Sequence, residues 1–457
     1  MTVYLISGRD NLAAIRQWTR LLAYGGLNFP LSTVGLPLAI YLAPFYAGEI
    51  GLPLAAVGTA MLIARLFNFA IDPLIGIATD RWRPKMGRRK VWVPLGTVTL
   101  ATGVWLLFNP PHGIGLTWFV MTLMLTYLGF VMTQLPYHAW GSELSSDYDE
   151  RTRITTVREF FSLGGLLFAT LIPAIILARK GATSADVLHA MSVAMIAGLA
   201  LFGALLFFFV PDTAQHRPHV ATDWRRTARQ LWRNGPYMRL VAILLFAFAA
   251  ETFRITITLF FSRDVVGVQN FGIIYVLYFG TGLLALPFWR WLGGRIGKHH
   301  ALLAAFAVVV VTNLLLYFVG QGQAALFTAM YMLKGSCFGA LELLPSAMAA
   351  DTADVDTVMS KQRRQGLLFA IYGMIVALGQ AVGQGLSLNL LEVIGFKAAG
   401  GNDAATIASF KLLYCLVPTA LMIVPMWILW RYPLTAARHG KFQHYVETRT
   451  LAPLGTP

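Results

Sequence analysis

The sequence predicts an all-α membrane protein in which twelve transmembrane helices form two pseudo-symmetric six-helix bundles. Three observations favour this fold class. Hydrophobic residues make up 57% of the chain and charged residues 12%, with a mean hydropathy of +0.62, whereas soluble domains carry about 25% charged residues. Apolar runs long enough to cross a bilayer recur along the whole chain. The Lys and Arg residues gather between alternate runs.

The apolar runs are each about 18 to 28 residues long, which is the length that an α-helix needs to cross the hydrocarbon layer. The eighth run is the least regular because it contains Pro287, Arg290 and Trp291. The predicted spans are residues 21–47, 54–79, 91–108, 115–140, 160–178, 190–210, 237–261, 271–292, 301–319, 324–350, 367–391 and 407–430. They define an N-terminal bundle (1–210), a basic cytoplasmic linker (211–236), a C-terminal bundle (237–430) and a cytoplasmic tail (431–457).

The basic residues set the expected orientation. With both termini in the cytoplasm, 26 of the 36 Lys and Arg residues fall in the tails and in the connections on that side, and only Arg179, Lys180, Arg263 and Lys397 fall on the other. This is the positive-inside pattern of membrane proteins. A nucleic-acid-binding protein would need a soluble basic surface, and the sequence offers no soluble domain for one. We expect a monomer that crosses the cytoplasmic (inner) membrane many times.

The sequence gives no sign of a cleaved leader, a metal site or a cofactor site. Residues 1–17 carry Arg9, Asp10 and Arg16 without the apolar core of a signal peptide. Cys337 and Cys415 fall inside predicted spans and have no metal-ligand spacing. We therefore expect two packing cysteines and no cofactor.

A short pattern occurs once in each half and indicates internal duplication. Each copy has Leu-Pro inside a span, carboxylates at the end of that span, and basic residues that open the next one. The copies are Leu135-Pro136 with Glu143, Asp147, Asp149, Arg151, Arg153 and Arg158, and Leu344-Pro345 with Asp351, Asp354, Asp356, Lys361, Arg363 and Arg364. Many secondary carriers are built from two six-span repeats with the solute site near the midplane. The alternative is chance similarity of two short segments.

Asp72 lies near the middle of the second predicted span, where an ionised carboxylate costs several kcal/mol unless water or a partner stabilises it. The stretch Asp72-Pro73-Leu74-Ile75-Gly76-Ile77-Ala78-Thr79-Asp80-Arg81, which continues to Gly87-Arg88-Arg89-Lys90, resembles a loop of the major facilitator superfamily. The resemblance is to the form found in the glycoside-pentoside-hexuronide:cation symporters, whose type member is melibiose permease. It continues in Leu135-Pro136-Tyr137, in Arg158-Glu159-Phe160-Phe161, and from Leu344-Pro345 to Arg364-Gln365-Gly366.

This resemblance implies the major facilitator fold and a secondary active transporter of a small organic solute, with a sugar or glycoside favoured. In the family, two acidic positions one helical turn apart in span two bind the coupling cation. The second of them is Asp72 here, whereas the first falls on Asn68 and the polar position between them on Ile71. A sodium site needs several hard oxygen ligands, so we expect coupling to protons rather than to sodium.

Other positions that handle sugar in the family also differ in this chain. An acidic residue of span four is replaced by Gln134, an aromatic residue by His138, and the lysine of span eleven by Ala377. The carboxylate of span one aligns near Leu31 or Ser32. A glycoside could still be carried, but most of the usual partners for its hydroxyl groups are absent.

The polar residues that remain inside the spans form the predicted site. Arg65, Asn68 and Asp72 share one helical face by their spacing, and we expect Arg158 to be the counter-ion of Asp72, either as part of the mechanism or as a permanent structural ion pair. The predicted coupling residues are Asp72, Asn68 and His138. The predicted solute-binding residues are Arg65, Gln134, Tyr137, Arg158, Glu251, Arg254, Lys334, Glu342 and Gln380. The predicted cytoplasmic gate comprises Asp80, Arg81, Arg88, Asp147, Arg151, Asp351 and Arg364.

In the second half, the spacing of three residues lets Glu251 pair with Arg254, either in the solute cavity or as a local bridge. Lys334 and Glu342 are two helical turns apart and are expected to line the same side of span ten. Gln380 and Gln384 share a face of span eleven.

Other function classes fit the sequence less well. A primary pump would need a phosphate-binding Gly-x-x-x-x-Gly-Lys-Ser/Thr loop, and an enzyme would need a clustered reactive set such as His-Glu-x-x-His; neither motif occurs. A lysolipid or amphiphile transporter on the same fold, or a sensor that transports nothing, is the alternative to a sugar carrier. The solute, the direction of transport and the oligomeric state are not encoded in a recognisable motif.

Overall fold

The computed structural model describes residues 8–82, 88–144, 147–179, 181–211, 231–268, 270–360 and 365–434. Across these residues the chain forms helices and no β-strand. The first half contains α1 (Gly8–Gly26), α2 (Asn28–Thr33), α3 (Gly35–Ile40), η1 (Pro44–Glu49), α4 (Leu54–Arg81), α5 (Arg88–Phe108), α6 (Leu116–Glu143), α7 (Tyr148–Ile176) and α8 (Ser184–Phe209). The second contains α10 (Gly235–Phe261), η2 (Ser262–Val266), α11 (Phe271–Leu284), α12 (Leu286–Ile296), α13 (Lys298–Leu315), η3 (Leu316–Phe318), α14 (Ala324–Ser360), α15 (Gln365–Val393) and α16 (Ala404–Trp430).

Every predicted span coincides with helical structure. Ten helices of the described ranges are long and apolar enough to cross a membrane, and α11 with α12, bent by 42°, makes an eleventh. The first predicted span is built from pieces, α1 to η1, because Pro30, Pro37 and Pro44 each lack the N–H group that a continuous helix requires. Pro287, at the start of α12, coincides with the bend in the irregular eighth span.

The chain divides into two compact units. The first comprises residues 1–52 and 63–217, and the second comprises residues 53–62 and 218–457. The division passes through α4, whose first turns belong to the second unit. Most of the predicted linker, at 212–230, lies outside the described residues, as do residues 435–457 of the predicted tail, so the predicted domain boundaries stay predictions.

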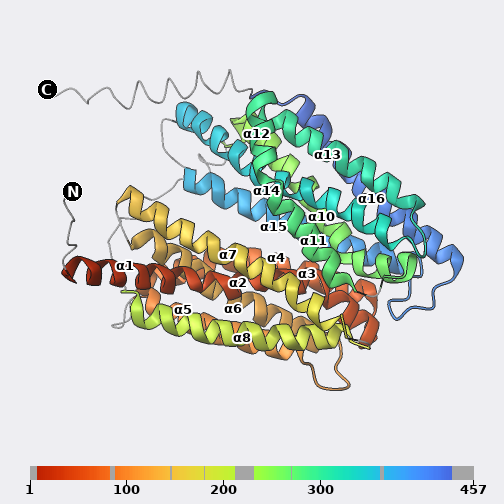
Figure 1. The fold of residues 1–457 in the computed structure, drawn as a ribbon, viewed down its shortest axis with the longest axis horizontal. Helices are drawn as coiled ribbons and strands as arrows, with labels where there is room; N and C mark the ends of the chain where they lie inside the picture. The colour runs from red at the N-terminus through yellow and green to blue at the C-terminus, as the bar shows by residue number, and fades with distance from the viewer. Residues whose placement is uncertain are drawn as a thin grey trace, which may run out of the picture. The chain divides into compact units, whose positions relative to one another are not determined.

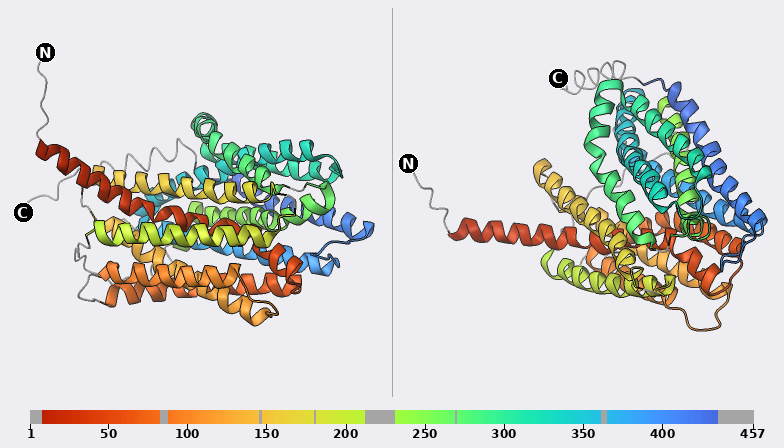
Figure 2. Two further views of the ribbon diagram at one scale, coloured as in Figure 1. Left: turned by 60° about the horizontal axis from the view of Figure 1, so that its bottom comes forward. Right: turned by 45° about the vertical axis from the view of Figure 1, so that its right-hand side comes forward.

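Glycines bring helix backbones into contact in both units. In the first unit, α5 and α6 pack side by side (Figure 1). A Cβ atom at Gly129 of α6 would collide with the main chain of Leu100 on α5, and one at Gly103 would collide with that of Thr126. In the second unit, Gly383 of α15 lies against the carbonyl group of Ala249 on α10, two helices that also pack together (Figure 2). Small residues at such contacts allow the close packing on which membrane helix bundles depend.

Two alanine substitutions should therefore have opposite effects on stability. Gly129→Ala is expected to destabilise the protein by about 1–3 kcal/mol, because the new Cβ would force α5 and α6 apart. Gly373→Ala, where a Cβ would meet no atom within 4 Å in α15, should stabilise it by about 0.5–1 kcal/mol, because alanine restricts the unfolded chain. The melting temperatures of both variants, measured in one detergent, check this prediction. Equal changes in melting temperature for the two variants would contradict the close contact at Gly129.

Candidate functional site

Asp72 lies on the face of α4 that contacts α6. The guanidinium group of Arg65 lies 5.4 Å from the ring centroid of Tyr127 on α6, and a Cβ atom at Gly76 would lie 3.5 Å from Leu135 of α6. Asp72 falls between these two contacts at helical spacing, so its side chain shares their face. It is half-buried and makes no ion pair with any described residue.

Arg158 pairs with Glu159 and not with Asp72. Its guanidinium group donates two hydrogen bonds to Oε1 of Glu159, at 3.1 and 2.7 Å. The expected ion pair between Arg158 and Asp72 is therefore wrong for this structure. The reason is local: Glu159 is the adjacent residue on α7 and is exposed, so its carboxylate reaches Arg158 without leaving water.

Tyr137, predicted to bind solute, is fully buried and joins α6 to α1. Its hydroxyl group donates to the carbonyl oxygen of Tyr24 at 2.9 Å, and the Tyr24 hydroxyl donates to the carbonyl oxygen of Tyr137 at 3.1 Å. The two rings stack with their centroids 4.7 Å apart. This reciprocal contact occupies both hydroxyl protons, so Tyr137 has a packing role in this structure.

The neighbouring polar residues are more accessible. His138 is exposed, and its ring centroid lies 5.5 Å from that of Tyr137. Gln134, one turn before His138, is half-buried. Asn68 has a buried side-chain oxygen that accepts no hydrogen bond from the described residues. The first unit therefore places a carboxylate, an amide oxygen and an imidazole on α4 and α6, two helices in contact.

In the second unit, Glu251 and Arg254 form the expected ion pair, and both are buried. The Arg254 guanidinium group also donates to the hydroxyl groups of Tyr278 at 3.0 Å and Tyr331 at 2.5 Å. It lies 5.2 and 5.0 Å from the centroids of these two rings. The Tyr278 hydroxyl group donates to Glu251 as well. The pair is thus the centre of a network and more than a local bridge.

The network extends from α10 to α16. The hydroxyl group of Thr258 lies 2.5 Å from that of Tyr331 and 3.0 Å from that of Tyr414, and the two tyrosine hydroxyl groups are 2.9 Å apart. We call Glu251, Arg254, Thr258, Tyr278, Tyr331 and Tyr414, together with Lys334 and Asn313, the buried polar cluster. It draws residues from α10, α11, α13, α14 and α16.

Lys334 and Glu342 of α14 differ in their surroundings. Lys334 is 1% exposed and its Nζ donates to Oδ1 of Asn313 on α13. Glu342 is exposed. The two residues therefore differ in exposure, and the expectation that both line one side of the helix stays a prediction. Gln380 of α15 is half-buried and Gln384 is buried.

Each unit has an ion pair between two helices in equivalent positions of the chain. Arg89, at the start of α5, donates to Glu143 at the end of α6 at 2.9 Å. Lys298, at the start of α13, donates to Asp351 of α14 at 2.7 Å. These helices are the third and fourth predicted spans of each half, so the pairs support the internal repeat. Of the predicted gate, Asp147 caps α7 by accepting from the Glu150 N–H group, and Asp351 is in the second pair. The side chains of Asp80, Arg81, Arg88, Arg151 and Arg364 lie outside the described residues.

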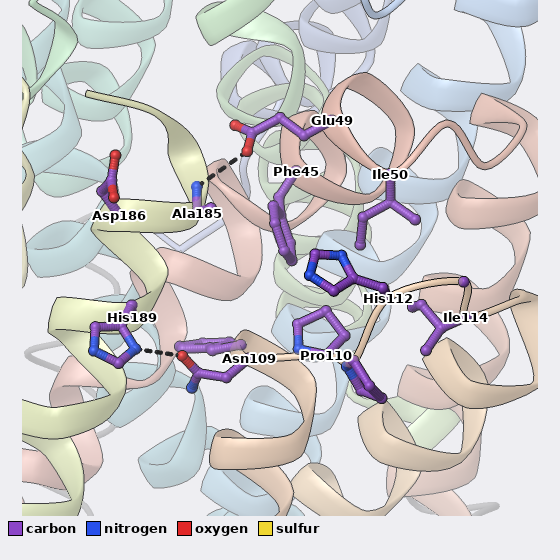
Figure 3. Close-up of a pocket in the computed structure, with 13 residues that line it drawn as sticks. Phe45, Glu49, Ile50, Asn109, Pro110, His112, Ile114, Ala185, Asp186 and His189 are labelled. Carbon is purple, nitrogen blue, oxygen red and sulfur yellow. Dashed lines mark hydrogen bonds between the residues drawn. The ribbon is translucent and has the colours of Figure 1, made fainter. Parts of the chain in front are cut away.

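A separate pocket of about 620 Å³ opens among the loops of the first unit. Figure 3 shows Phe45, His112 and Ile50 beside one another on its wall. Glu49 accepts hydrogen bonds from the N–H groups of Ser184 and Ala185 and so caps α8. His189 lies 2.5 Å from Oδ1 of Asn109. None of the predicted site residues lines this pocket.

The amino-acid sequence matches a known family. The profile of the family described as MFS/sugar transport protein matches residues 23–436, which is nearly the whole chain. The chain belongs to this family. It is therefore a multi-pass membrane transporter with the major facilitator fold, and the predicted fold class and family are confirmed.

Individual relatives of the transporter are distant but cover nearly its full length. The glucuronide carrier protein homolog of Escherichia coli (strain K12) is 23% identical over 427 residues, which cover 90% of this chain and 91% of the relative. The sphingosine-1-phosphate transporter MFSD2B of Mus musculus is 24% identical over 438 residues, which cover 89% and 87%. The crystal structure of the nucleoside transporter NupG superposes with a TM-score of 0.65 at 14% identity, covering 90% of this chain and 98% of that one.

Sequence reasoning missed the tyrosines of this transporter's buried cluster. Tyr278, Tyr331 and Tyr414 were not expected to be polar site residues, because tyrosine in an apolar span is commonly a packing or interfacial residue. Arg89 and Lys298 were also missed as ion-pair partners. A signal for Tyr331 was available: it stands three residues before Lys334 and thus within reach of one helical face.

Proposed function

We propose that this transporter moves a glycoside across the cytoplasmic membrane by alternating access and couples the movement to protons. One observation carries the proposal: Asp72 lies inside the membrane-spanning stretch Leu54–Thr79, in its C-terminal half, half-buried and without an ion-pair partner among the described residues. A carboxylate in that position can exist with or without its proton, whereas a carboxylate fixed by a cation remains ionised.

The oxygen ligands around Asp72 support protons over sodium. Sodium binding needs several hard oxygen ligands. On α4 the turn around Asp72 offers its own carboxylate and the amide oxygen of Asn68, while Ile71 supplies no ligand. We assign Asp72 to proton binding, and Asn68 and His138 to positions that adjust its environment.

The predicted solute-binding residues that are accessible in this structure are proposed to contact the solute. Arg65, Gln134 and Arg158 belong to the first unit, and Glu342 and Gln380 to the second, where they are half-buried or exposed. Tyr137, Glu251, Arg254 and Lys334, also predicted to bind solute, are buried in this structure, so contact with solute would require them to become accessible. The gate residues are proposed to act at the cytoplasmic ends of the helices, with both termini in the cytoplasm.

The substrate class can be tested by counterflow in proteoliposomes. We expect vesicles loaded with unlabelled melibiose or methyl β-D-glucuronide to take up the same labelled sugar. In vesicles that contain no sugar, an inward-directed proton gradient, acidic outside, should drive accumulation of the labelled sugar. A sodium gradient should drive none. Vesicles without the protein provide the control. Accumulation driven by sodium but not by protons would contradict the coupling proposal.

A second candidate function is movement of an amphiphile, which the similarity to the mouse sphingosine-1-phosphate transporter favours. Labelled sphingosine-1-phosphate and a lysophospholipid belong in the same assay. Uptake of either lipid without sugar counterflow would replace the glycoside proposal. If neither class moved, the sensor alternative would be favoured.

A further inference from the structure

Lys334 is a buried lysine that pairs with no carboxylate in the described part of the chain. The residue is 1% exposed and lies in the first third of α14. Among the residues that the structure describes, its side chain donates to the amide oxygen of Asn313 alone, and its Nζ lies 5.9 Å from the centroid of the Tyr331 ring. No carboxylate of the described residues lies within 4.0 Å of Nζ. A permanently charged ammonium group at this depth would be expected to hold an anion.

The charges of the surrounding helices do not supply that anion. The titratable groups that act on Lys334 are Glu251 and Arg254 from α10, Tyr331 and Cys337 from α14, and Cys415 from α16. The carboxylate of Glu251 is already paired with Arg254 and accepts from Tyr278. Glu251 and Arg254 therefore balance each other, and an ammonium group on Lys334 would leave the cluster with one uncompensated positive charge.

A neutral amine fits the observed contacts without that charge. A neutral lysine keeps two N–H donors, so it can still donate to Asn313. Transfer of an isolated ammonium group out of water is far more costly than transfer of a neutral, hydrogen-bonded amine. The geometry thus suits the unprotonated amine as long as the cluster stays closed.

We propose that Lys334 is a proton-binding residue of the transporter. Its Nζ is neutral in the closed packing seen here, and the nitrogen lone pair takes up a proton from water when the cluster opens. The proton returns to water when the cluster closes, and no other bond changes. The role of this step in the transport cycle rests on the proposed carrier function, but the proton binding itself does not. It is a second site, separate from Asp72.

The proton can be counted on purified protein without any solute. Between about pH 9 and about pH 5.5, the wild-type protein in detergent should take up one more proton than K334M. K334R, which holds a permanent charge, should lose the same proton. K411M is the matched control, because Lys411 lies over the Tyr317 ring at 5.4 Å, outside the cluster, and should titrate like wild type. Equal uptake by wild type and K334M would overturn the proposal.

Thermal unfolding separates proton binding from a merely structural role. At about pH 9 we expect K334M to unfold at the same temperature as wild type or higher, because methionine replaces a neutral amine of similar size. As the pH falls, wild type should lose stability relative to K334M, because the unfolded chain binds a proton at Lys334 that the closed cluster excludes. A gap in melting temperature that did not vary with pH would contradict this.

The link to transport is tested in the D72N background with melibiose or methyl β-D-glucuronide. Sugar exchange by D72N should still change with pH, and D72N/K334M should lose that dependence. Exchange with the same pH dependence in both variants would remove Lys334 from the cycle. If neither sugar exchanged in any variant, the proposed function would fail, while the proton count would still decide the protonation of Lys334.

Discussion

Asp72→Asn is expected to abolish solute accumulation driven by a pH gradient and to leave solute exchange intact. The amide has nearly the shape of the protonated acid, so the helix packing and the solute site should persist. It cannot bind or release a proton, however, so a pH gradient can no longer drive solute accumulation. Accumulation is measured as uptake of melibiose or methyl β-D-glucuronide into proteoliposomes with and without a pH gradient. Exchange is measured as counterflow of the same sugars.

Asp264→Asn is a matched control, because Asp264 is a carboxylate of η2 that pairs with Arg263, away from the middle of any long helix. It should retain both activities. Accumulation by Asp72→Asn at the wild-type level would exclude Asp72 from coupling. Loss of exchange together with accumulation would instead indicate a role in solute binding or in packing.

Arg254→Met is expected to destabilise the protein by about 3–5 kcal/mol, because it leaves the carboxylate of Glu251 buried without its cation. The substitution also removes donors to Tyr278 and Tyr331. Glu251→Gln with Arg254→Met should recover much of the loss, since the pair then carries no charge. Unfolding of the two single variants and the double variant completes a cycle that isolates the pairwise energy.

Additive losses in this cycle would contradict the prediction. If the double variant lost the sum of the two single losses, Glu251 and Arg254 would stabilise the second unit independently, and the charge balance argued for the cluster would not hold. Lys298→Met gives a comparison, because its ion pair with Asp351 is partly exposed and should be worth only about 0–1 kcal/mol.

The ion pair between Glu251 and Arg254 was predictable from spacing, whereas that of Arg158 was not. Side chains three residues apart on one helix are neighbours on its surface. The pair between Glu251 and Arg254 could therefore be predicted without knowing which helices lie beside α10. The sequence offered Asp72 as the partner of Arg158 on chemical grounds, whereas the structure pairs Arg158 with its neighbour Glu159 on α7.

The repeat was also partly visible in the sequence. Leu135-Pro136 and Leu344-Pro345 with their acidic residues marked the equivalent helices α6 and α14. Their basic partners, Arg89 and Lys298, stand at the starts of the preceding helices α5 and α13. No local pattern connects residues that are about 54 positions apart, as Arg89 and Glu143 are, so only the fold could identify these pairs.

Hydropathy and composition by themselves determined the class of protein and the position of the spans, and the resemblance of short motifs indicated the family. The reason is that the bilayer imposes a fixed length and an apolar surface on every span, and these requirements are written residue by residue along the chain. Asp72 could be singled out for the same reason, because a carboxylate departs from the apolar composition that the bilayer requires of each span.

Tertiary structure alone decided which polar groups meet. The buried polar cluster assembles side chains from five helices, and its tyrosines look like packing residues until α11, α14 and α16 are placed around Arg254. Whether Lys334 faces a carboxylate or the amide of Asn313 depends on helix rotations of a few tens of degrees. Such rotations are set by the close contacts of glycines and large side chains between helices, and no local sequence pattern encodes them.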